Sequence, residues 1–379
     1  MIEGDESRVP WRLRHAWRSA SDRAALDVCR IHLARGGIDL VDAVPDTHPD
    51  AIKMHGMEIV DTLCAGAPQL LDLRDAAVAQ RWATRLPAFV RRFMEHGEAW
   101  HGIPVGVHRA NCMWVNAEIA ARAGLPAPTD WAGLVTWLSA LDRSVPAPLA
   151  VGREPWQIGI LFENLVLATG SAGFYRRALV DLDRAALCGA LMQEVLDRMN
   201  VLRDHVDDSV LSLSWSQQLQ RVREGSSVLQ IMGDWVRPAA GAAVTEWIVP
   251  GTTSSFVSIV DFFVPCTRPG GGSDATARQI AARAAAALIE PDFQRAFSRV
   301  KGSSPALRID DSDGDEWHDP RRALLDRAGT EDVVVPSLTF DQACSLPTKR
   351  ALLEVVADHF INRRPPHASA ALLASVVDG

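Results

Sequence analysis

The stretch Ile103-Pro104-Val105-Gly106-Val107-His108-Arg109-Ala110-Asn111-Cys112-Met113-Trp114-Val115-Asn116 opens with an apolar run, which predicts a buried β-strand over residues 103–107. Segments with helical periodicity alternate with strand-like runs on both sides of this stretch. The expected helices cover 21–34 (capped by Ser21 or Asp22), 131–141 (capped by Thr129), the stripe 280–289 (ended by Pro291), 352–360 and 370–377, and the expected strands cover 38–41, 228–232, 245–249 and 256–264. This alternation predicts an α/β fold.

Length and charge exclude several classes of protein. The chain has 379 residues, enough for two or three domains, and 47% of them are hydrophobic, which excludes a disordered chain and a collagen. Its net charge is −8 and its basic residues are not clustered, so no nucleic-acid partner is expected. No apolar run approaches 18 residues, so no membrane span is expected. Residues 1–8 are acidic and polar, unlike a signal peptide; the chain is therefore expected to be intracellular as given, or to have lost its leader.

Motifs for catalysis, metals and cofactors are not found. The six cysteines (Cys29, Cys64, Cys112, Cys188, Cys266 and Cys344) are far apart; their even number permits disulfides, but buried free thiols are favoured. Gly270–Gly272 lacks the residues of a phosphate-binding loop and is expected to be a surface turn. The acidic run 310–316 lacks the register of a calcium loop and is expected to be a solvated loop. We therefore predict no catalytic residue, no metal and no cofactor.

Further motifs follow the opening stretch in a definite order. They are Ala123-Gly124-Leu125-Pro126-Ala127-Pro128-Thr129-Asp130-Trp131, Trp156-Gln157, Ile231-Met232-Gly233-Asp234-Trp235 and Lys301-Gly302-Ser303-Ser304-Pro305-Ala306. Each motif alone is weak, but their order from Pro104 to Ala306 resembles the extracellular solute-binding proteins of bacterial ABC importers. Within that family the chain looks closest to the glucose/mannose-binding branch. The earlier stretch His15–Asp22 is similar to the family as well, more weakly.

The resemblance implies an architecture and a role. The fold would be a two-lobed, periplasmic-binding-protein-like α/β fold with a ligand cleft between the lobes and two or three hinge crossings. The first lobe would comprise residues 1–107 and 257–306, and the second lobe residues 108–256 and 307–379. The chain would be a monomeric, periplasmic receptor that closes on a carbohydrate and delivers it to an ABC permease. It would not be an enzyme. Without a leader, its location would be cytoplasmic.

The resemblance also implies ligand-binding residues. A sugar needs polar partners for its hydroxyl groups and an aromatic face for its C–H surface. The positions carried over are Trp17, Asp22, Lys53, His55, His108, Trp156, Trp215, Asp234, Trp235, Asp261 and Lys301. Among them, Trp215 and Trp235 would stack on the sugar ring. For His108 and Trp156 a structural role competes with ligand contact, and Trp114, Trp131 and Trp137 are expected to pack in the core.

The chain departs from the family pattern in four places. Ala16 stands for a tryptophan, Lys53 stands for a glutamine, and Ser337–Asp341 lacks the family's histidine. The segment 37–49 is also shorter. If Lys53, near Arg18 and Trp17, has no protein partner, an acidic or phosphorylated sugar is favoured. If Asp22 neutralises Lys53, a neutral sugar is favoured.

Two further functions stay open at the level of sequence. The lost ligand residues and the missing leader suit an orphan sensor or regulatory partner that is not coupled to transport. An enzyme on a binding-protein-like fold is the third alternative.

Overall fold

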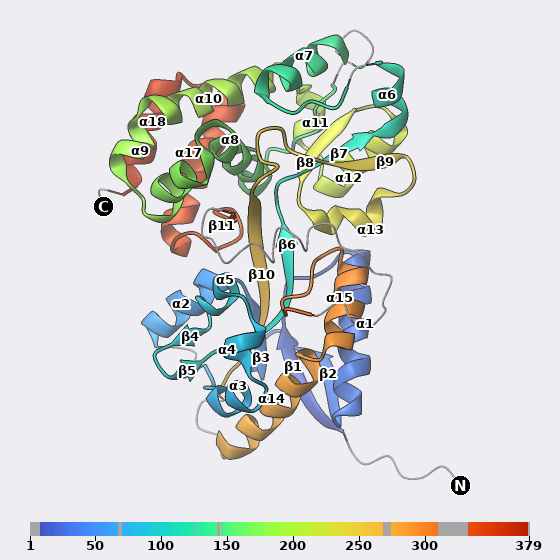
Figure 1. The fold of residues 1–379 in the computed structure, drawn as a ribbon, viewed down its shortest axis with the longest axis vertical. Coiled ribbons are helices and arrows are strands. Elements are labelled where there is room, and N and C mark those ends of the chain that lie inside the picture. The colour runs from blue at the N-terminus through green and yellow to red at the C-terminus, as the bar shows by residue number, and fades with distance from the viewer. Residues whose placement is uncertain are drawn as a thin grey trace. The chain divides into compact units, whose positions relative to one another are not determined.

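The chain forms two compact units in the computed structural model, which describes residues 8–66, 70–124, 126–141, 145, 147–267, 274–309 and 333–377 (Figure 1). Unit 1 comprises Met1–His108 and Ile259–Gly329, and unit 2 comprises Arg109–Ser258 and Thr330–Gly379. The chain therefore changes units at 108/109 and 258/259, where the sequence suggests 107/108 and 256/257. Residues 307–309 belong to unit 1 instead of the second lobe, because the Arg308 N–H donates to the Arg85 carbonyl at 2.9 Å.

A mixed sheet forms the core of unit 1. Strand β1 (Val9–Arg14) pairs in parallel with β2 (Ile38–Asp42) and with β3 (Ala51–Met54). Strand β3 pairs antiparallel with the end of β10 (Phe256–Pro265), in the register Phe262 opposite Met54. Strand β6 (Ile103–Arg109) also pairs with β10, and every residue of both strands is buried. The apolar runs at 103–107 and 256–264 are thus central strands, as their sequence predicts.

Helix α1 (Ala20–Arg35) joins β1 to β2. Its N-cap is Ser19 and not Ser21 or Asp22; Asp22 is the third helical residue and completes a capping box with Ser19. The chain leaves the helix through Gly37, whose φ of +70° favours glycine. Helices α14 (Asp274–Leu288) and α15 (Pro291–Lys301) pack against α1, so Pro291 begins a second helix after the first has ended (Figure 1).

Short elements complete the described part of unit 1 between β3 and β6. They are α2 (Gly56–Ala65), α3 (Arg74–Ala79), α4 (Trp82–Arg85), α5 (Ala88–Arg91), β4 (Glu95–His96) and β5 (Ala99–Trp100). The predicted turn at 270–272 and the acidic run 310–316 lie outside the described residues.

Unit 2 combines a small sheet with helices. Strand β7 (Cys112–Asn116) lies between β8 (Leu229–Met232) and β9 (Val244–Ile248), antiparallel to both, with Cys112 opposite Met232 and Ile248. Strand β11 (Val334–Pro336) pairs in parallel with Phe256–Ser258, the unit 2 part of β10. Helices and turns of unit 2 near this sheet are α6 (Ala117–Arg122), α7 (Trp131–Leu141), α11 (Asp208–Leu211), α12 (Trp215–Glu224), η2 (Asp234–Val236) and α13 (Arg237–Ala240). Asp130, and not Thr129, bonds the first turn of α7, through the Gly133 N–H at 2.8 Å.

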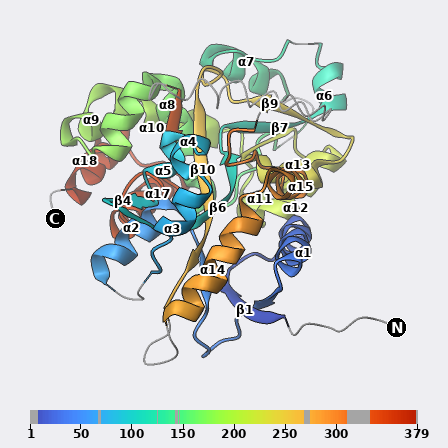
Figure 2. The ribbon, with the colours of Figure 1, turned by 60° about the horizontal axis from the view of Figure 1, so that its bottom comes forward.

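Helix α8 (Pro155–Tyr175), continued by η1 (Arg176–Val180), is the longest of the described helices that the sequence analysis misses; α2, α10 (Ala190–Arg203) and α12 are others. Within these 26 residues of α8 and η1 a window of 18 has a mean hydropathy of 1.3, so the helix is long and apolar enough to cross a membrane, contrary to our expectation. However, 72% of the most apolar window is buried inside the fold, as in the core helix of a soluble protein. Helices α10 and α17 (Leu346–Asn362) pack on α8, and α9 (Arg184–Cys188) and α18 (Pro366–Val376) pack next to them (Figure 2).

All six cysteines are free thiols, which confirms the alternative favoured over disulfides. Cys29, Cys112, Cys266 and Cys344 are buried, and burial raises the pKa of Cys266 to about 12. Cys64 is exposed and Cys188 is half-buried, so the prediction of burial is wrong for these two.

Candidate functional site

Four of the predicted ligand residues form one polar group in unit 1, which we call the Asp261 cluster: Lys53, His55, His108 and Asp261. Asp261, on β10, is almost fully buried, and its carboxylate lies 2.9 Å from Lys53 Nζ, 3.3 Å from His55 Nε2 and 3.7 Å from His108 Nε2. Burial raises the pKa of this carboxyl, but the Lys53 charge and the two imidazoles outweigh burial and hold the pKa well below its usual range.

Lys53 is therefore paired inside the protein. Lys53 Nζ also lies 2.5 Å from His55 Nε2, and His55 Nδ1 lies 3.4 Å from the Glu58 carboxylate. The carboxylate partner of Lys53 is Asp261 and not Asp22, the alternative that the sequence suggested. The premise of an unpaired cation is wrong, so the argument from Lys53 for an acidic or phosphorylated ligand no longer holds.

A second group in unit 1 brings together Trp17, Asp22 and Lys301. Lys301, the last residue of α15, forms an ion pair with Asp22, and its Nζ lies 4.4 Å from the centre of the Trp17 ring. Burial raises the pKa of Asp22, but the Lys301 charge and the hydrogen bonds from Lys301 and Ser19 lower it by more. The net effect is a pKa below the usual value of 3.8. Asp22 thus serves the α1 cap and the Lys301 pair at once, while the half-buried Trp17 presents an indole surface.

Three rings meet in unit 2, in what we call the aromatic cluster: Trp156, Trp235 and Phe340. The Trp235 and Phe340 centroids are 5.0 Å apart in an edge-to-face contact, and the Trp156 and Phe340 centroids are 6.2 Å apart. Each of the three residues is half-buried, so the cluster keeps accessible ring surface. Sequence reasoning treated position 340 only as a lost histidine and missed Phe340 as the ring that joins the other two.

The backbone around Trp235 requires a glycine and a buried acid. A Cβ on Gly233 would lie 1.9 Å from the Trp235 ring, so the indole folds back over a position where only glycine fits. Asp234 is completely buried and accepts the Arg109 N–H at 2.9 Å. Asp234 therefore shapes the turn that carries Trp235, and its predicted ligand contact stays a prediction.

The other predicted tryptophans divide between surface and core. Trp215 is half-buried at the start of α12, and its carbonyl accepts the Gln230 side chain at 3.1 Å; among the described ring contacts it is not part of the aromatic cluster. Trp114 and Trp137 are buried, as expected for core residues. Trp131 is half-buried, with the Arg198 guanidinium 5.0 Å from its ring centre.

A buried acid that sequence reasoning missed lies in α8. The Glu163 carboxylate accepts the Leu338 N–H at 2.8 Å, the Thr339 N–H at 3.3 Å and the Ser337 hydroxyl at 3.0 Å. Burial raises the pKa of Glu163 to about 7, although these hydrogen bonds act to lower it. The signal in the sequence was a single acidic residue inside the apolar run Ile160-Leu161-Phe162-Glu163, which helical periodicity alone does not single out.

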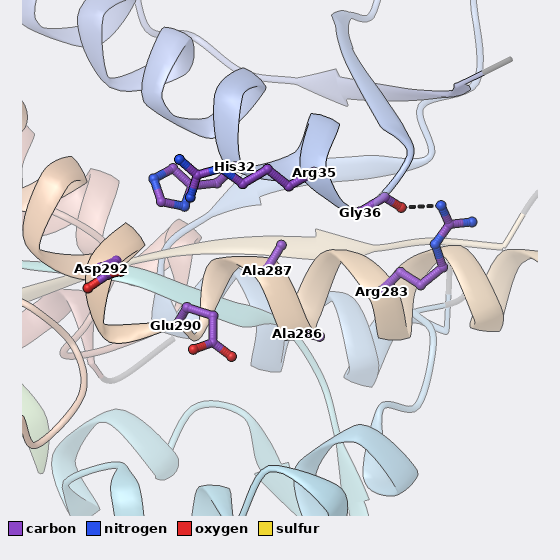
Figure 3. A pocket seen from close by; sticks show the side chains of 8 residues that line it. All are labelled: His32, Arg35, Gly36, Arg283, Ala286, Ala287, Glu290 and Asp292. Atoms are coloured by element: carbon purple, nitrogen blue, oxygen red, sulfur yellow. Dashed lines mark hydrogen bonds between the residues drawn. The ribbon is translucent and has the colours of Figure 1, made fainter. Parts of the chain in front are cut away.

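Unit 1 also contains a hollow of about 380 Å³ between α1 and the α14–α15 region (Figure 3). It is lined by His32, Arg35, Gly36, Arg283, Ala286, Ala287, Glu290 and Asp292. The Arg283 guanidinium donates to the Gly36 carbonyl at one end (Figure 3). Both charge signs line this hollow, none of the predicted ligand residues does, and we assign it no role.

Known proteins place the chain in a family. No family model matches it. A probable sugar-binding periplasmic protein of Rhizobium meliloti is 32% identical over 372 residues, which cover 91% of this chain and 88% of that protein. The chain belongs to the family of sugar-binding periplasmic proteins. This confirms the resemblance to solute-binding proteins, and it favours a transport receptor over a sensor. The name of this relative specifies no particular sugar.

More distant similarities agree with this assignment. An ABC transporter extracellular-binding protein of Pyrococcus horikoshii is 21% identical over 306 residues, 78% of this chain and 66% of that protein. The solved structure of a chitin oligosaccharide binding protein superposes with a TM-score of 0.79 over 98% of both chains at 16% identity. At such identity the structural likeness shows the fold alone, and that fold is the two-lobed α/β architecture predicted from the sequence.

Proposed function

We propose that this chain is the substrate-binding receptor of an ABC importer, which binds a sugar without covalent chemistry and passes it to the permease. The observation that carries the proposal is the aromatic cluster, a set of partly exposed rings in a member of a sugar-binding family. Aromatic rings of this kind bind the C–H face of a sugar, and their area is a large part of the binding energy. We further propose that the protein is located in the periplasm and functions as a monomer.

Unit 1 contributes polar groups of its own. Lys301 and Asp22 form a mutually neutralised pair next to the Trp17 indole, and the Asp261 cluster balances one carboxylate with one lysine. Such paired charges can donate to and accept from hydroxyl groups while they present no net charge to the ligand. We therefore propose a neutral sugar as the ligand.

A thermal-shift screen tests the function. The panel contains D-glucose, D-galactose, maltose, chitobiose, D-gluconate and glucose 6-phosphate. A neutral sugar at 100 times its dissociation constant should stabilise the protein by about 2.7 kcal/mol. A panel in which only the two anionic compounds stabilise would contradict the neutral ligand, and turnover of any compound would contradict a binding protein without catalysis.

The Trp235→Ala substitution tests the aromatic cluster. It should weaken binding of the best sugar of the panel by about 2 kcal/mol or more, roughly thirtyfold in Kd, because it removes a central ring from the binding surface. Isothermal titration calorimetry measures the change. Trp131→Leu is the matched control, since Trp131 is a half-buried tryptophan of the same unit outside the cluster, and its affinity should be unchanged. An unchanged Kd in Trp235→Ala would place the sugar elsewhere.

A further inference from the structure

The partners of the Glu163 carboxylate converge on one short turn of unit 2. Ser337, Leu338 and Thr339 follow strand β11, and each of them donates to Glu163 from its hydroxyl or its backbone N–H. Glu163 itself lies in the middle of α8 and is completely buried. A single side chain of α8 thus anchors the backbone of this turn.

The same turn carries Phe340, the joining ring of the aromatic cluster. The Phe340 N–H donates to Ser337 Oγ at 3.3 Å, so the serine hydroxyl connects Glu163 to the residue that bears the ring. The Phe340 ring in turn contacts Trp235 and Trp156. Every contact in this chain, from Glu163 through the turn to Trp235, lies within unit 2.

The Tyr175 hydroxyl lies next to Glu163 and offers a hydrogen-bond partner for the protonated as well as the ionised carboxyl group. The Tyr175 hydroxyl donates to the Pro336 carbonyl at 2.8 Å, and its oxygen lies 3.2 Å from Glu163 Oε2. An ionised Glu163 accepts from the turn through charge-assisted hydrogen bonds, which are roughly twice as strong as neutral ones. A protonated Glu163 can donate to the Tyr175 oxygen instead and holds the turn less firmly.

We propose that Glu163 is a positioning residue for the aromatic cluster: its carboxylate fixes the Ser337–Phe340 turn and thereby sets the Phe340 ring against Trp235. This rests on the proposed function, in which the cluster contacts the sugar. The ionisation state of Glu163 then tunes sugar affinity. With a pKa of about 7, raised by burial, Glu163 changes its charge close to neutral pH.

Other ionisable groups lie on α8 itself and on the elements that pack against it. The buried or half-buried ones include Tyr175, Arg176, Arg198, Arg203, Asp341 paired with Lys349, Cys344, Asp358 and His359. Burial raises the pKa of Tyr175 well above its usual range, so Tyr175 stays protonated. Burial lowers the pKa of His359 from 6.5, so a midpoint near 7 distinguishes Glu163 from His359.

The test follows the Phe340 ring directly and needs no ligand. The full chain is prepared with 4-fluorophenylalanine at position 340, and its ¹⁹F resonance is recorded between pH 5.5 and 8.5. We expect one step with a midpoint near pH 7. Ser337→Ala removes a bond that favours the ionised acid and should move the midpoint to higher pH, and Glu163→Gln should abolish the step. Glu194→Gln removes an exposed acid of the same unit and should leave the step unchanged.

Two results would overturn the inference. One is a resonance that does not respond to pH in the parent chain, and the other is a step that persists in Glu163→Gln. Ser337→Ala keeps the test decisive if Glu163→Gln does not fold, since an unmoved midpoint in Ser337→Ala also contradicts the assignment. Asp341→Asn tests the acid that follows Phe340 directly. If the fluorine step is lost in Asp341→Asn and kept in Glu163→Gln, the titrating group is Asp341.

Sugar affinity supplies the second readout. If only the ionised form holds the cluster in its binding geometry, the best sugar of the panel should bind up to about tenfold more tightly at pH 8 than at pH 6, because the competent fraction rises from about one tenth to nine tenths. Glu163→Gln should remove this dependence. If no panel compound binds, the proposed function fails while the fluorine step still stands; if a sugar binds with the same Kd at both pH values, the coupling fails while the function stands.

Discussion

Lysine is rare in this chain, and all three lysines form the same kind of contact. Against 36 arginines the sequence contains only Lys53, Lys301 and Lys349. Each forms an ion pair with an aspartate: Asp261, Asp22 and Asp341, respectively. Their side chains are only 10%, 6% and 13% exposed. A compact ammonium fits one buried carboxylate, whereas a guanidinium would bring further N–H groups that need partners.

The pair of Lys53 and Asp261 should behave as a coupled unit. Lys53→Met leaves a buried carboxylate without its principal cation, and Asp261→Asn leaves a buried ammonium, so each should cost about 3–5 kcal/mol of unfolding free energy. The double variant should cost much less than the sum, because it buries no unpaired charge. Chemical denaturation measures all four corners of the cycle. Additive losses would mean that the two side chains do not interact.

Acid should weaken this pair in a predictable window. The pKa of Asp261 is held below 3.8 in the folded chain, so its stabilisation is complete above the unfolded pKa. That stabilisation is lost as the pH falls through the lower, folded pKa. The pair therefore supports unit 1 throughout the neutral range.

At the scale of elements, five strands were predicted from the sequence, whereas β1, β3, β7 and the longest helix were not. The apolar runs at 103–107, 228–232 and 256–264 became β6, β8 and β10 within two residues at each end, because a buried strand needs little more than a short apolar run. Helix α8 is buried on every side from Gln157 to Leu167, so its apolar residues do not form a single stripe by which an amphipathic helix is recognised.

The candidate site was predictable in part for a similar reason. Trp17, Trp235 and Lys301 stood out as rare residue types beside recognisable motifs. Phe340 and Glu163 did not stand out. Each belongs to a common residue type, and their connection becomes visible only through the turn that joins them. The N-cap of α1 was predicted two or three residues too late. Ser19, Ser21 and Asp22 are all residue types that cap helices well, so the sequence alone does not choose among them.

The contact between α8 and the Ser337–Phe340 turn should make stability depend on pH. The pKa of Glu163 is raised from 4.5 to about 7, so the folded chain binds a proton that the unfolded chain has released. The contribution of Glu163 to the free energy of unfolding is therefore greatest below pH 4.5. It falls as the pH rises through 7, by about 3 kcal/mol in total.

Comparison of two variants isolates this contribution. The difference in unfolding free energy between wild type and Glu163→Gln should shrink by that amount between pH 4.5 and 8, measured by urea denaturation at each pH. Other titrating groups are common to both proteins and cancel. A constant difference across this range would show that Glu163 has an ordinary pKa.

At the scale of the whole molecule, the receptor function implies a change of shape. The family resemblance predicts that ligand draws the two units together. Small-angle scattering should therefore show a smaller radius of gyration when the best sugar is saturating. The Trp235→Ala variant at the same sugar concentration is the control, because it should stay largely unbound. An unchanged radius at saturation would contradict closure and leave binding intact.

The burial of all three lysines makes amine chemistry a built-in reporter of opening. An ammonium that is held in an ion pair with an aspartate and largely shielded from solvent is a poor nucleophile and a poor cleavage site. Acylating reagents and lysine-specific proteases should therefore spare Lys53, Lys301 and Lys349 in the native protein and attack all three in denaturant. Peptide mass mapping assigns each event to its position: Lys53 and Lys301 report on unit 1, and Lys349 reports on unit 2. Native labelling of Lys53 at the denatured rate would show that its pair with Asp261 opens freely. The rates of lysine labelling and cleavage thus report on local unfolding of each unit separately, without an engineered probe.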